Sequence, residues 1–133
     1  MPTSDQIYHK RPELEKGIYF AQTCKVGNVL HISGCVSWDA AGTIIGVGDM
    51  RTQVTQVYTD LKETLEANGI SLKNVIKETV FTTDIDAFVA NNDVRTRFYT
   101  EAESAPPAAT WVGCARLVDP DLLLEIECIA QLN

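Results

Sequence analysis

The chain has 133 residues, the size of one domain, so residues 1–133 are expected to bury roughly two-thirds of their unfolded surface around one core. Hydrophobic residues make up 45% and charged residues 22%, which excludes a disordered chain. The net charge is -7 and the 11 Lys and Arg residues are scattered, which argues against a nucleic acid partner, because a phosphate backbone requires a concentrated basic surface.

The first residues are polar and carry charges of both signs. We expect residues 1–16 to form a loosely held arm that joins the sheet only near Gly17. Residues 1–6 lack the basic and apolar regions of a signal peptide, and no apolar run approaches the ~18–20 residues that cross a bilayer. These features predict a cytoplasmic protein with no membrane partner.

Two β-favouring runs, 18–26 and 29–37, flank the dipeptide Gly27-Asn28. A Gly-Asn pair between such runs favours a tight hairpin, so two antiparallel strands are predicted. A turn is expected at 39–42, followed by a short third strand over 43–45.

A helical period begins after Asp49, a residue type that caps helices. Its apolar positions recur at three and four residues: Val54, Val57, Leu61 and Leu65. Asn68-Gly69 supplies the left-handed residue that ends helices. The next strand is predicted over 75–83, and reaching it through a helix permits a parallel crossover.

A second helical stretch follows capping residues at 84–86 and carries apolar residues between Phe88 and Phe98. The polar trio 91–93 lies in its middle, and Asn and Asp prefer caps to helix interiors. Either the helix is broken there or one Asn has a local role. Residues 104–107, with two prolines, end the element.

The last third of the chain contains two runs, 106–117 and 122–130, which are predicted to be adjacent strands joined by a turn at 118–121. Alternation in the second run places its even-numbered apolar residues on one face and Glu125 and Glu127 on the other. Leucines occur on both faces, so the strand is expected to be partly covered on both sides. One Glu could then line a half-buried cleft, the alternative being a solvated face.

The order of elements, β-β-(β)-α-β-α-β-β, predicts an α+β fold with a mixed sheet and two helices on one face. Nothing in the chain would cover the other face, where Leu123 and Ile129 would leave an apolar patch too large for a monomer. Oligomerisation through this face is the expected remedy. It would put Glu125 and Glu127 near a subunit interface, where clefts tend to form.

The four cysteines show no metal-ligand spacing, so no metal site is expected: Cys24, Cys35, Cys114 and Cys128. In apolar strand contexts they are interpreted as reduced, buried side chains. Alternation over 29–35 puts His31 and Cys35 on one face, but nothing there would activate a thiol. Thiol chemistry is therefore the weakest functional hypothesis.

Several short sequence motifs occur in a specific order and spacing: Ile32-Ser33-Gly34, residues 75–81 followed by Thr83-Asp84-Ile85, Phe88 with Asn92 and Phe98-Tyr99, Pro107-Ala108, Ala115-Arg116-Leu117, and residues 124–130. Together, over roughly residues 17–131, they resemble the YjgF/RidA-like family. Its members are small trimeric enamine/imine deaminases with a chorismate mutase-like fold. The resemblance implies that fold, a homotrimer with sites at subunit interfaces, a small-molecule substrate and no cofactor.

Three positions match active-site residues of that family. The resemblance implies that Ser33 and Asn92 hold the substrate by hydrogen bonds and that Glu125 positions the hydrolytic water. An imine carbon is already electrophilic, so a positioned water and a carboxylate base are sufficient for hydrolysis. Partial burial would raise the pKa of Glu125 toward neutrality and make it a better base.

Four further positions are expected to contact substrate: Phe20, Ala109, Thr110 and Trp111. Phe20 falls where many members of the family have Tyr, and Trp111 falls where a Cys is common. Ala109 is a departure, because active imine deaminases carry there an Arg that grips the substrate carboxylate. Neither Ala109 nor Thr110 can form the paired hydrogen bonds of an arginine with a carboxylate. Arg116 is not expected to replace that arginine, because it belongs to the Ala-Arg-Leu motif that is usual in the family.

The predicted function is a hydrolase, a deaminase of an enamine or imine. Trp111 and the missing Arg favour an extended compound such as 2-aminomuconate, or an aromatic-derived one, over 2-aminoacrylate. The alternative is a non-catalytic small-ligand-binding or regulatory protein on the same trimeric fold, since a site without its anchor can bind without turnover. The ribonuclease activity sometimes ascribed to this family fits poorly with so acidic a chain.

Overall fold

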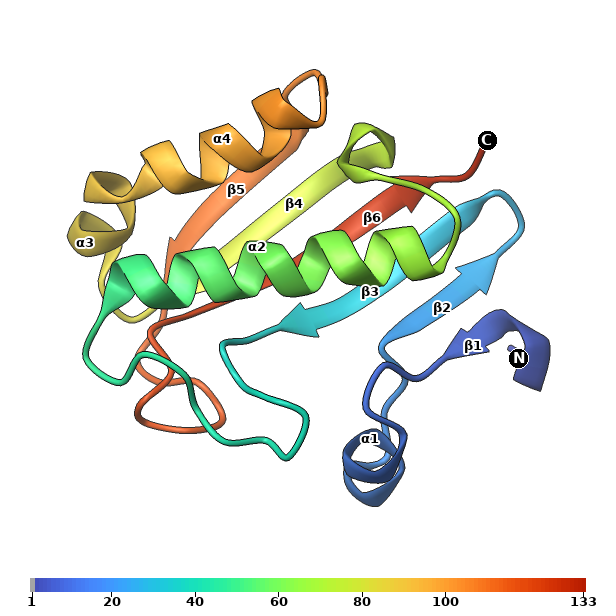
Figure 1. Ribbon diagram of the computed structural model, residues 1–133, viewed down its shortest axis with the longest axis horizontal. Helices are drawn as coiled ribbons and strands as arrows, with labels where there is room; N and C mark the ends of the chain where they lie inside the picture. The colour runs from blue at the N-terminus through green and yellow to red at the C-terminus, as the bar shows by residue number, and fades with distance from the viewer. Residues whose placement is uncertain (1) are drawn as a thin grey trace.

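The computed structural model describes residues 2–133. In chain order the elements are η1 (Ser4–Gln6), β1 (Ile7–Tyr8), α1 (Pro12–Ile18), β2 (Thr23–Val26), β3 (Val29–Cys35), α2 (Met50–Ala67), η2 (Leu72–Asn74), β4 (Val75–Thr82), α3 (Ile85–Ala90), α4 (Asn92–Glu101), β5 (Ala108–Gly113) and β6 (Leu124–Gln131). The strands form one sheet in the order β1-β2-β3-β6-β4-β5, in which only β4 and β5 run parallel (Figure 1). The predicted α+β class with a mixed sheet is confirmed.

The predicted hairpin around Gly27-Asn28 is confirmed, with Val26 paired to Val29. Its first strand starts later than expected, because Pro12–Ile18 forms α1, which ends at Tyr19 in the left-handed conformation with φ 76°. The expected third strand at 43–45 is reduced to a single bridge between Trp38 and Ile44.

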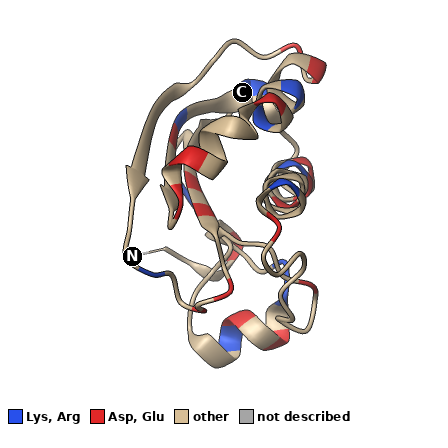
Figure 2. Cartoon of the chain, turned by 90° about the vertical axis from the view of Figure 1, so that its left-hand side faces the viewer, with Lys and Arg blue, Asp and Glu red and all other residues tan. Residues whose placement is uncertain are grey.

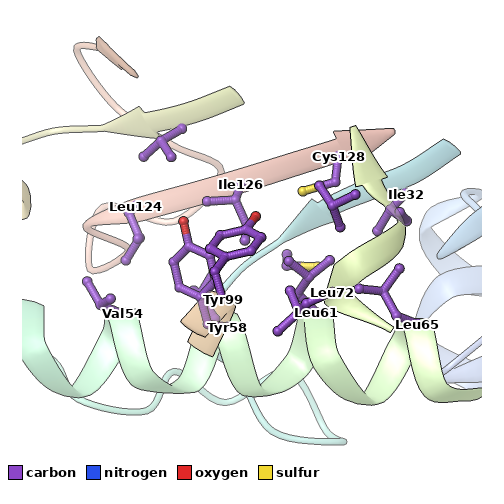
Figure 3. Close-up of a cluster of buried hydrophobic side chains, with 14 of the residues drawn as sticks. Ile32, Val54, Tyr58, Leu61, Leu65, Leu72, Tyr99, Leu124, Ile126 and Cys128 are labelled. Atoms are coloured by element: carbon purple, nitrogen blue, oxygen red, sulfur yellow. The ribbon is translucent and has the colours of Figure 1, made fainter. Parts of the chain in front are cut away.

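Helix α2 has the predicted ends. The side chain of Asp49 accepts a hydrogen bond from the backbone N–H of Thr52, and Gly69 takes the left-handed conformation just after the helix, with φ 76°. The stripe at three- and four-residue spacing is fully buried and forms the centre of the core with Tyr58 and the buried face of β6 (Figure 3). Amphipathic periodicity therefore predicted the packing of α2 correctly.

The second helical stretch is broken within the polar trio, as one of the two expectations had it. α3 ends at Ala90 and α4 begins at Asn92. Between them, Asn91 donates its side-chain N–H to Ala87 O at 2.8 Å and its backbone N–H to Phe88 O at 3.0 Å. These bonds satisfy the end of α3 and allow the chain to change direction.

The two C-terminal strands are not adjacent, contrary to the prediction. β4 lies between them, parallel to β5 and antiparallel to β6. β5 is also shorter than expected, since it ends at Gly113 and a loop leads on to β6. The physical reason is that β5 follows a helical crossover and pairs in parallel with the strand before it, so the loop must carry β6 back to the centre of the sheet.

The helices α2, α3 and α4 cover one face of the sheet, and Figure 2 shows α2 end-on beside the sheet. On β6, Leu124, Ile126 and Cys128 are buried beneath the helices, whereas Glu125 and Glu127 lie on the opposite face, called here the open face. The alternation predicted for this strand is confirmed. Among residues 2–133, none of the helices combines the length and apolarity needed to cross a membrane.

The N-terminal segment is packed on the domain. β1 pairs with β2, so the prediction that the chain joins the sheet only near Gly17 is wrong. Arg11 is buried and donates to Asp60 Oδ1 at 2.9 Å and Trp38 O at 3.2 Å, while Glu15 accepts from the Arg11 N–H. Charges that suggest a solvated arm in the sequence instead pair with each other and with Asp60 on α2.

Candidate active site

A β-bulge shapes the open face where β3 passes β6. Ile32 pairs with Cys128 and Cys35 with Ile126, so Ser33 and Gly34 together oppose one residue of β6. The extra residue returns Cys35 to the helix side, where it is 1% exposed, while His31 is exposed on the open face. The expectation that His31 and Cys35 share a face is therefore wrong. Burial, with a smaller contribution from Asp60, raises the pKa of the Cys35 thiol, which disfavours thiolate chemistry.

Glu125 lies over this bulge. A Cβ at position 34 would overlap Oε2 of Glu125, so glycine lets the carboxylate lie directly against the backbone of β3. Beside the carboxylate is a cavity of about 330 Å³ with mostly apolar walls. Its lining residues are Ile18, Phe20, Ser33, Gly34, Val36, Trp38, Val118 and Glu125. Three of the predicted site residues, Phe20, Ser33 and Glu125, thus line one cavity.

The Glu125 carboxylate is partly desolvated and has no hydrogen-bond or ion-pair partner among residues 2–133. Burial raises its pKa, and the carboxylate of Glu127 raises it further. A carboxylate with a raised pKa and no protein donor is suited to take a proton from a bound water.

Ser33 is fixed in its hydrogen bonding. Its Oγ donates to Ala21 O at 2.5 Å, and its backbone N–H donates to Gln22 O at 2.8 Å. Because the hydroxyl proton is committed to Ala21, Ser33 Oγ meets a ligand as an acceptor. The predicted hydrogen bond from substrate to Ser33 would therefore have the substrate as donor.

The remaining predicted residues lie elsewhere. Ala109 pairs with Glu78 and Trp111 with Val80, both buried beneath the helices, so Ala109 and Trp111 face the helix side. The Trp111 ring packs edge-on against Phe88, with centroids 5.1 Å apart. Thr110 faces the open side and accepts a hydrogen bond from Lys77 Nζ at 2.9 Å.

Asn92 opens α4 on the helix side of the sheet. Its Oδ1 is buried and has no hydrogen-bond partner in the part of the chain that the structure describes. Six of the seven predicted residues therefore form two groups in one chain, and Thr110 belongs to neither. The base group is Phe20, Ser33 and Glu125 on the open face, and the edge group is Asn92, Ala109 and Trp111 on the helix side.

Several residues beside these groups were missed from the sequence, among them Gly34, Trp38 and Val118 of the cavity and Arg95 on α4. Gly34 belongs to the motif Ile32-Ser33-Gly34, which resembles the family. Arg95 contacts Trp111 and follows Asn92 by one helical turn. Both positions carried a usable signal. Trp38 and Val118 line the cavity from loops, and hydrophobic periodicity does not predict the path of a loop. Among residues 2–133, no group of three or more His, Cys, Asp or Glu side chains is placed to hold a metal ion.

Comparisons with known proteins find relatives of one family. The family model described as Endoribonuclease L-PSP matches residues 11–132. A RutC family protein of Pyrococcus horikoshii is 39% identical over 111 residues, which cover 84% of this chain and 85% of the relative. A protein of Dermatophagoides farinae named 2-iminobutanoate/2-iminopropanoate deaminase is 31% identical over 114 residues, which cover 86% of both chains.

Solved structures agree. E. coli TdcF, determined with bound serine, superimposes with a TM-score of 0.78 and 31% identity, covering 86% of this chain and 88% of TdcF. The E. coli YjgF gene product gives a TM-score of 0.78 and 30% identity with the same coverage. The chain therefore belongs to the YjgF/RidA-like family, to which the Endoribonuclease L-PSP model corresponds.

Proposed function

We propose that this protein is a hydrolytic deaminase of enamine or imine substrates, with Glu125 as the general base. The observation that carries the proposal is the Glu125 carboxylate, which is partly buried, has a raised pKa and borders a cavity of about 330 Å³. The Dermatophagoides farinae relative is named a 2-iminobutanoate/2-iminopropanoate deaminase, which agrees with this chemistry.

The reaction follows from the base group. Glu125 removes a proton from a bound water while the water oxygen bonds to the imine carbon, and the C=N electron pair moves to nitrogen, which takes that proton from Glu125 to give a carbinolamine. The carbinolamine then collapses: its hydroxyl gives its proton to Glu125, which passes it to the nitrogen, the C=O bond forms, the C–N bond breaks and ammonia leaves. Ser33 Oγ, an available acceptor, suits an N–H of the substrate.

The site is completed by a second copy of the chain in this proposal. The base group and the edge group lie on opposite faces of the sheet, so one chain cannot close both around one small molecule. The helices α2, α3 and α4 lie on the other side of the sheet from the open face (Figure 1), and all six residues of the edge strand β5 are exposed. We expect a homotrimer in which the edge group of one copy meets the base group of the next.

Two substrate classes fit this site. Short 2-imino acids are those in the name of the mite relative. Extended compounds such as 2-aminomuconate were favoured by the size of Trp111. Trp111 does not line the cavity beside Glu125 in its own chain, so it would narrow the site only from a neighbouring copy.

The test is ammonia release from freshly generated 2-iminopropanoate, 2-iminobutanoate and 2-aminomuconate, each with wild-type protein and Glu125→Gln. Release that the substitution abolishes would support the proposal, and the preferred substrate would choose between the two classes. No release from any of the three would contradict it. The non-catalytic ligand-binding alternative, which Ala109 favours, would then be the better account.

A further inference from the structure

We propose that Arg95 is the residue that binds the carboxylate of the substrate, in place of an arginine at position 109. The inference rests on the proposed function, because it assigns the anchor of the same two-copy site. The ligand class is a small molecule with a free carboxylate, such as a 2-imino acid.

Arg95 is held rigidly beside β5. Its Nε donates to Glu78 Oε1 at 2.7 Å, and its side chain is only 11% exposed. The guanidinium carbon lies 5.2 Å from the ring centroid of Tyr99 and 5.3 Å from that of Trp111. A guanidinium fixed by a carboxylate and two aromatic rings loses little further freedom when it binds a ligand.

The outer end of the guanidinium is free. A guanidinium has five N–H donors, and the bond to Glu78 uses the one on Nε. Neither Nη atom donates a hydrogen bond to an acceptor among residues 2–133. Two adjacent Nη groups match the two oxygens of a carboxylate, the geometry that makes arginine its preferred partner.

Glu78 does not depend on Arg95 alone for its donors. Its Oε2 accepts hydrogen bonds from Tyr58 Oη at 2.9 Å and Tyr99 Oη at 2.7 Å. Figure 3 shows both phenol oxygens pointing from the helix layer toward the sheet. Because three donors share the charge of Glu78, Arg95 can serve a second carboxylate at its outer end without leaving the first one unsatisfied.

Position 109 is compatible with this arrangement. Ala109 is the register partner of Glu78, and Trp111 is the next residue on the same face. The guanidinium that bonds Glu78 and contacts Trp111 therefore lies beside Ala109, where only a methyl group competes for space. Asn92, one turn before Arg95 on α4, has a buried Oδ1 with no hydrogen-bond donor among residues 2–133.

The experiment compares a stable keto acid, 2-oxobutanoate, with its uncharged methyl ester by NMR titration. The wild-type protein should bind the acid at least tenfold more tightly. In Arg95→Gln, the acid affinity should fall by about 10- to 100-fold while the ester affinity is unchanged, since only a charge-assisted pair is lost. Arg97→Gln is the matched control: Arg97 is 60% exposed on the same helix and should leave both affinities unaltered.

Arg95→Lys is the second variant, which keeps the charge opposite Glu78 if Arg95→Gln does not fold. It should lose part of the acid affinity, because an ammonium is not a bidentate donor. An unchanged acid-to-ester ratio in a folded Arg95 variant, or no acid preference in the wild type, would overturn the proposal. Ammonia release is scored separately. If Arg95 determines the preference for the acid but no ammonia is released, only the deaminase function is contradicted. If ammonia is released but the preference for the acid does not depend on Arg95, only the role of Arg95 is contradicted.

Discussion

Each face of the sheet carries a shielded glutamate, and the two have opposite surroundings. On the helix side, Glu78 is fully buried and accepts hydrogen bonds from Tyr58, Tyr99 and Arg95. On the open face, Glu125 is partly buried beside a cavity and accepts no hydrogen bond from any residue between Pro2 and Asn133.

This contrast separates a structural carboxylate from a reactive one. Burial and then Glu78 raise the pKa of Tyr58, and the same two causes raise the pKa of Tyr99, so both phenols stay protonated and keep donating. Glu125 has only causes that favour its protonated form, burial first and Glu127 second. A carboxylate without donors gains most from a proton, which is the property that a general base needs.

The largest expected effect is on turnover. Glu125→Gln should lower kcat for ammonia release by about 10²- to 10⁴-fold, because the amide cannot accept the proton of water. The fold should persist, because no residue from Pro2 to Asn133 donates a hydrogen bond to this carboxylate. Glu127→Gln, two residues along the same strand, should keep its turnover at neutral and higher pH. Equal losses in the two variants would refute the distinct role of Glu125.

The next effect is on stability. Glu78→Ala should reduce the free energy of unfolding by about 3–5 kcal/mol, because it leaves a buried guanidinium and two buried hydroxyls without their acceptor. Urea unfolding at fixed protein concentration measures the loss. The exposed Glu127→Ala should stay within about 0.5 kcal/mol of the wild type. A cost below about 1 kcal/mol at Glu78 would show that the buried cluster does not stabilise the fold.

Gly34→Ala addresses the position of the base. The added methyl would overlap the Glu125 carboxylate, a flexible side-chain end that can move aside, so the chain should fold with little loss of stability. Displacing the base by about 1 Å should cost on the order of 100-fold in kcat. Wild-type turnover in Gly34→Ala would mean that the contact between Gly34 and Glu125 does not set the reactive geometry.

The smallest effect is on pH dependence. Glu125 acts deprotonated, so kcat should fall as pH decreases through its raised pKa. Glu127→Gln removes the second cause of that raised pKa, so the acid limb of the pH–rate profile should move to lower pH, by less than about one unit. Glu101→Gln on α4 should not move it. A shift to higher pH would contradict the assignment of the limb to Glu125.

The position of Glu125 in this contrast was accessible from the sequence, whereas the burial of Glu78 was not predicted. Alternation in β6 placed Glu125 opposite the core residues Leu124 and Ile126, because a strand with period two has only two faces. Capping chemistry gave the ends of α2, and for the polar trio 91–93 it left a helix break as one of two alternatives. These features depend on neighbours along the chain, which a single sequence displays.

The features that were missed depend on pairing at a distance. The bulge at Ser33-Gly34 reverses the face of Cys35 and arises only when β3 meets β6. The insertion of β6 between β3 and β4 requires the loop after Gly113, which has no periodic signal. Arg95 gained a role only when α4 placed it against Glu78 and Trp111, residues 17 positions before it and 16 after it.

Subunit complementation tests the central claim most directly, namely that the Glu125 of one copy works with the Asn92 of another. Glu125→Gln and Asn92→Ala are each expected to release ammonia very slowly alone. After unfolding and joint refolding in equal amounts, random assembly should restore about a quarter of the wild-type sites, those that combine an intact residue from each neighbour. No recovery in well-assembled mixtures, or full activity of Asn92→Ala by itself, would contradict a shared site.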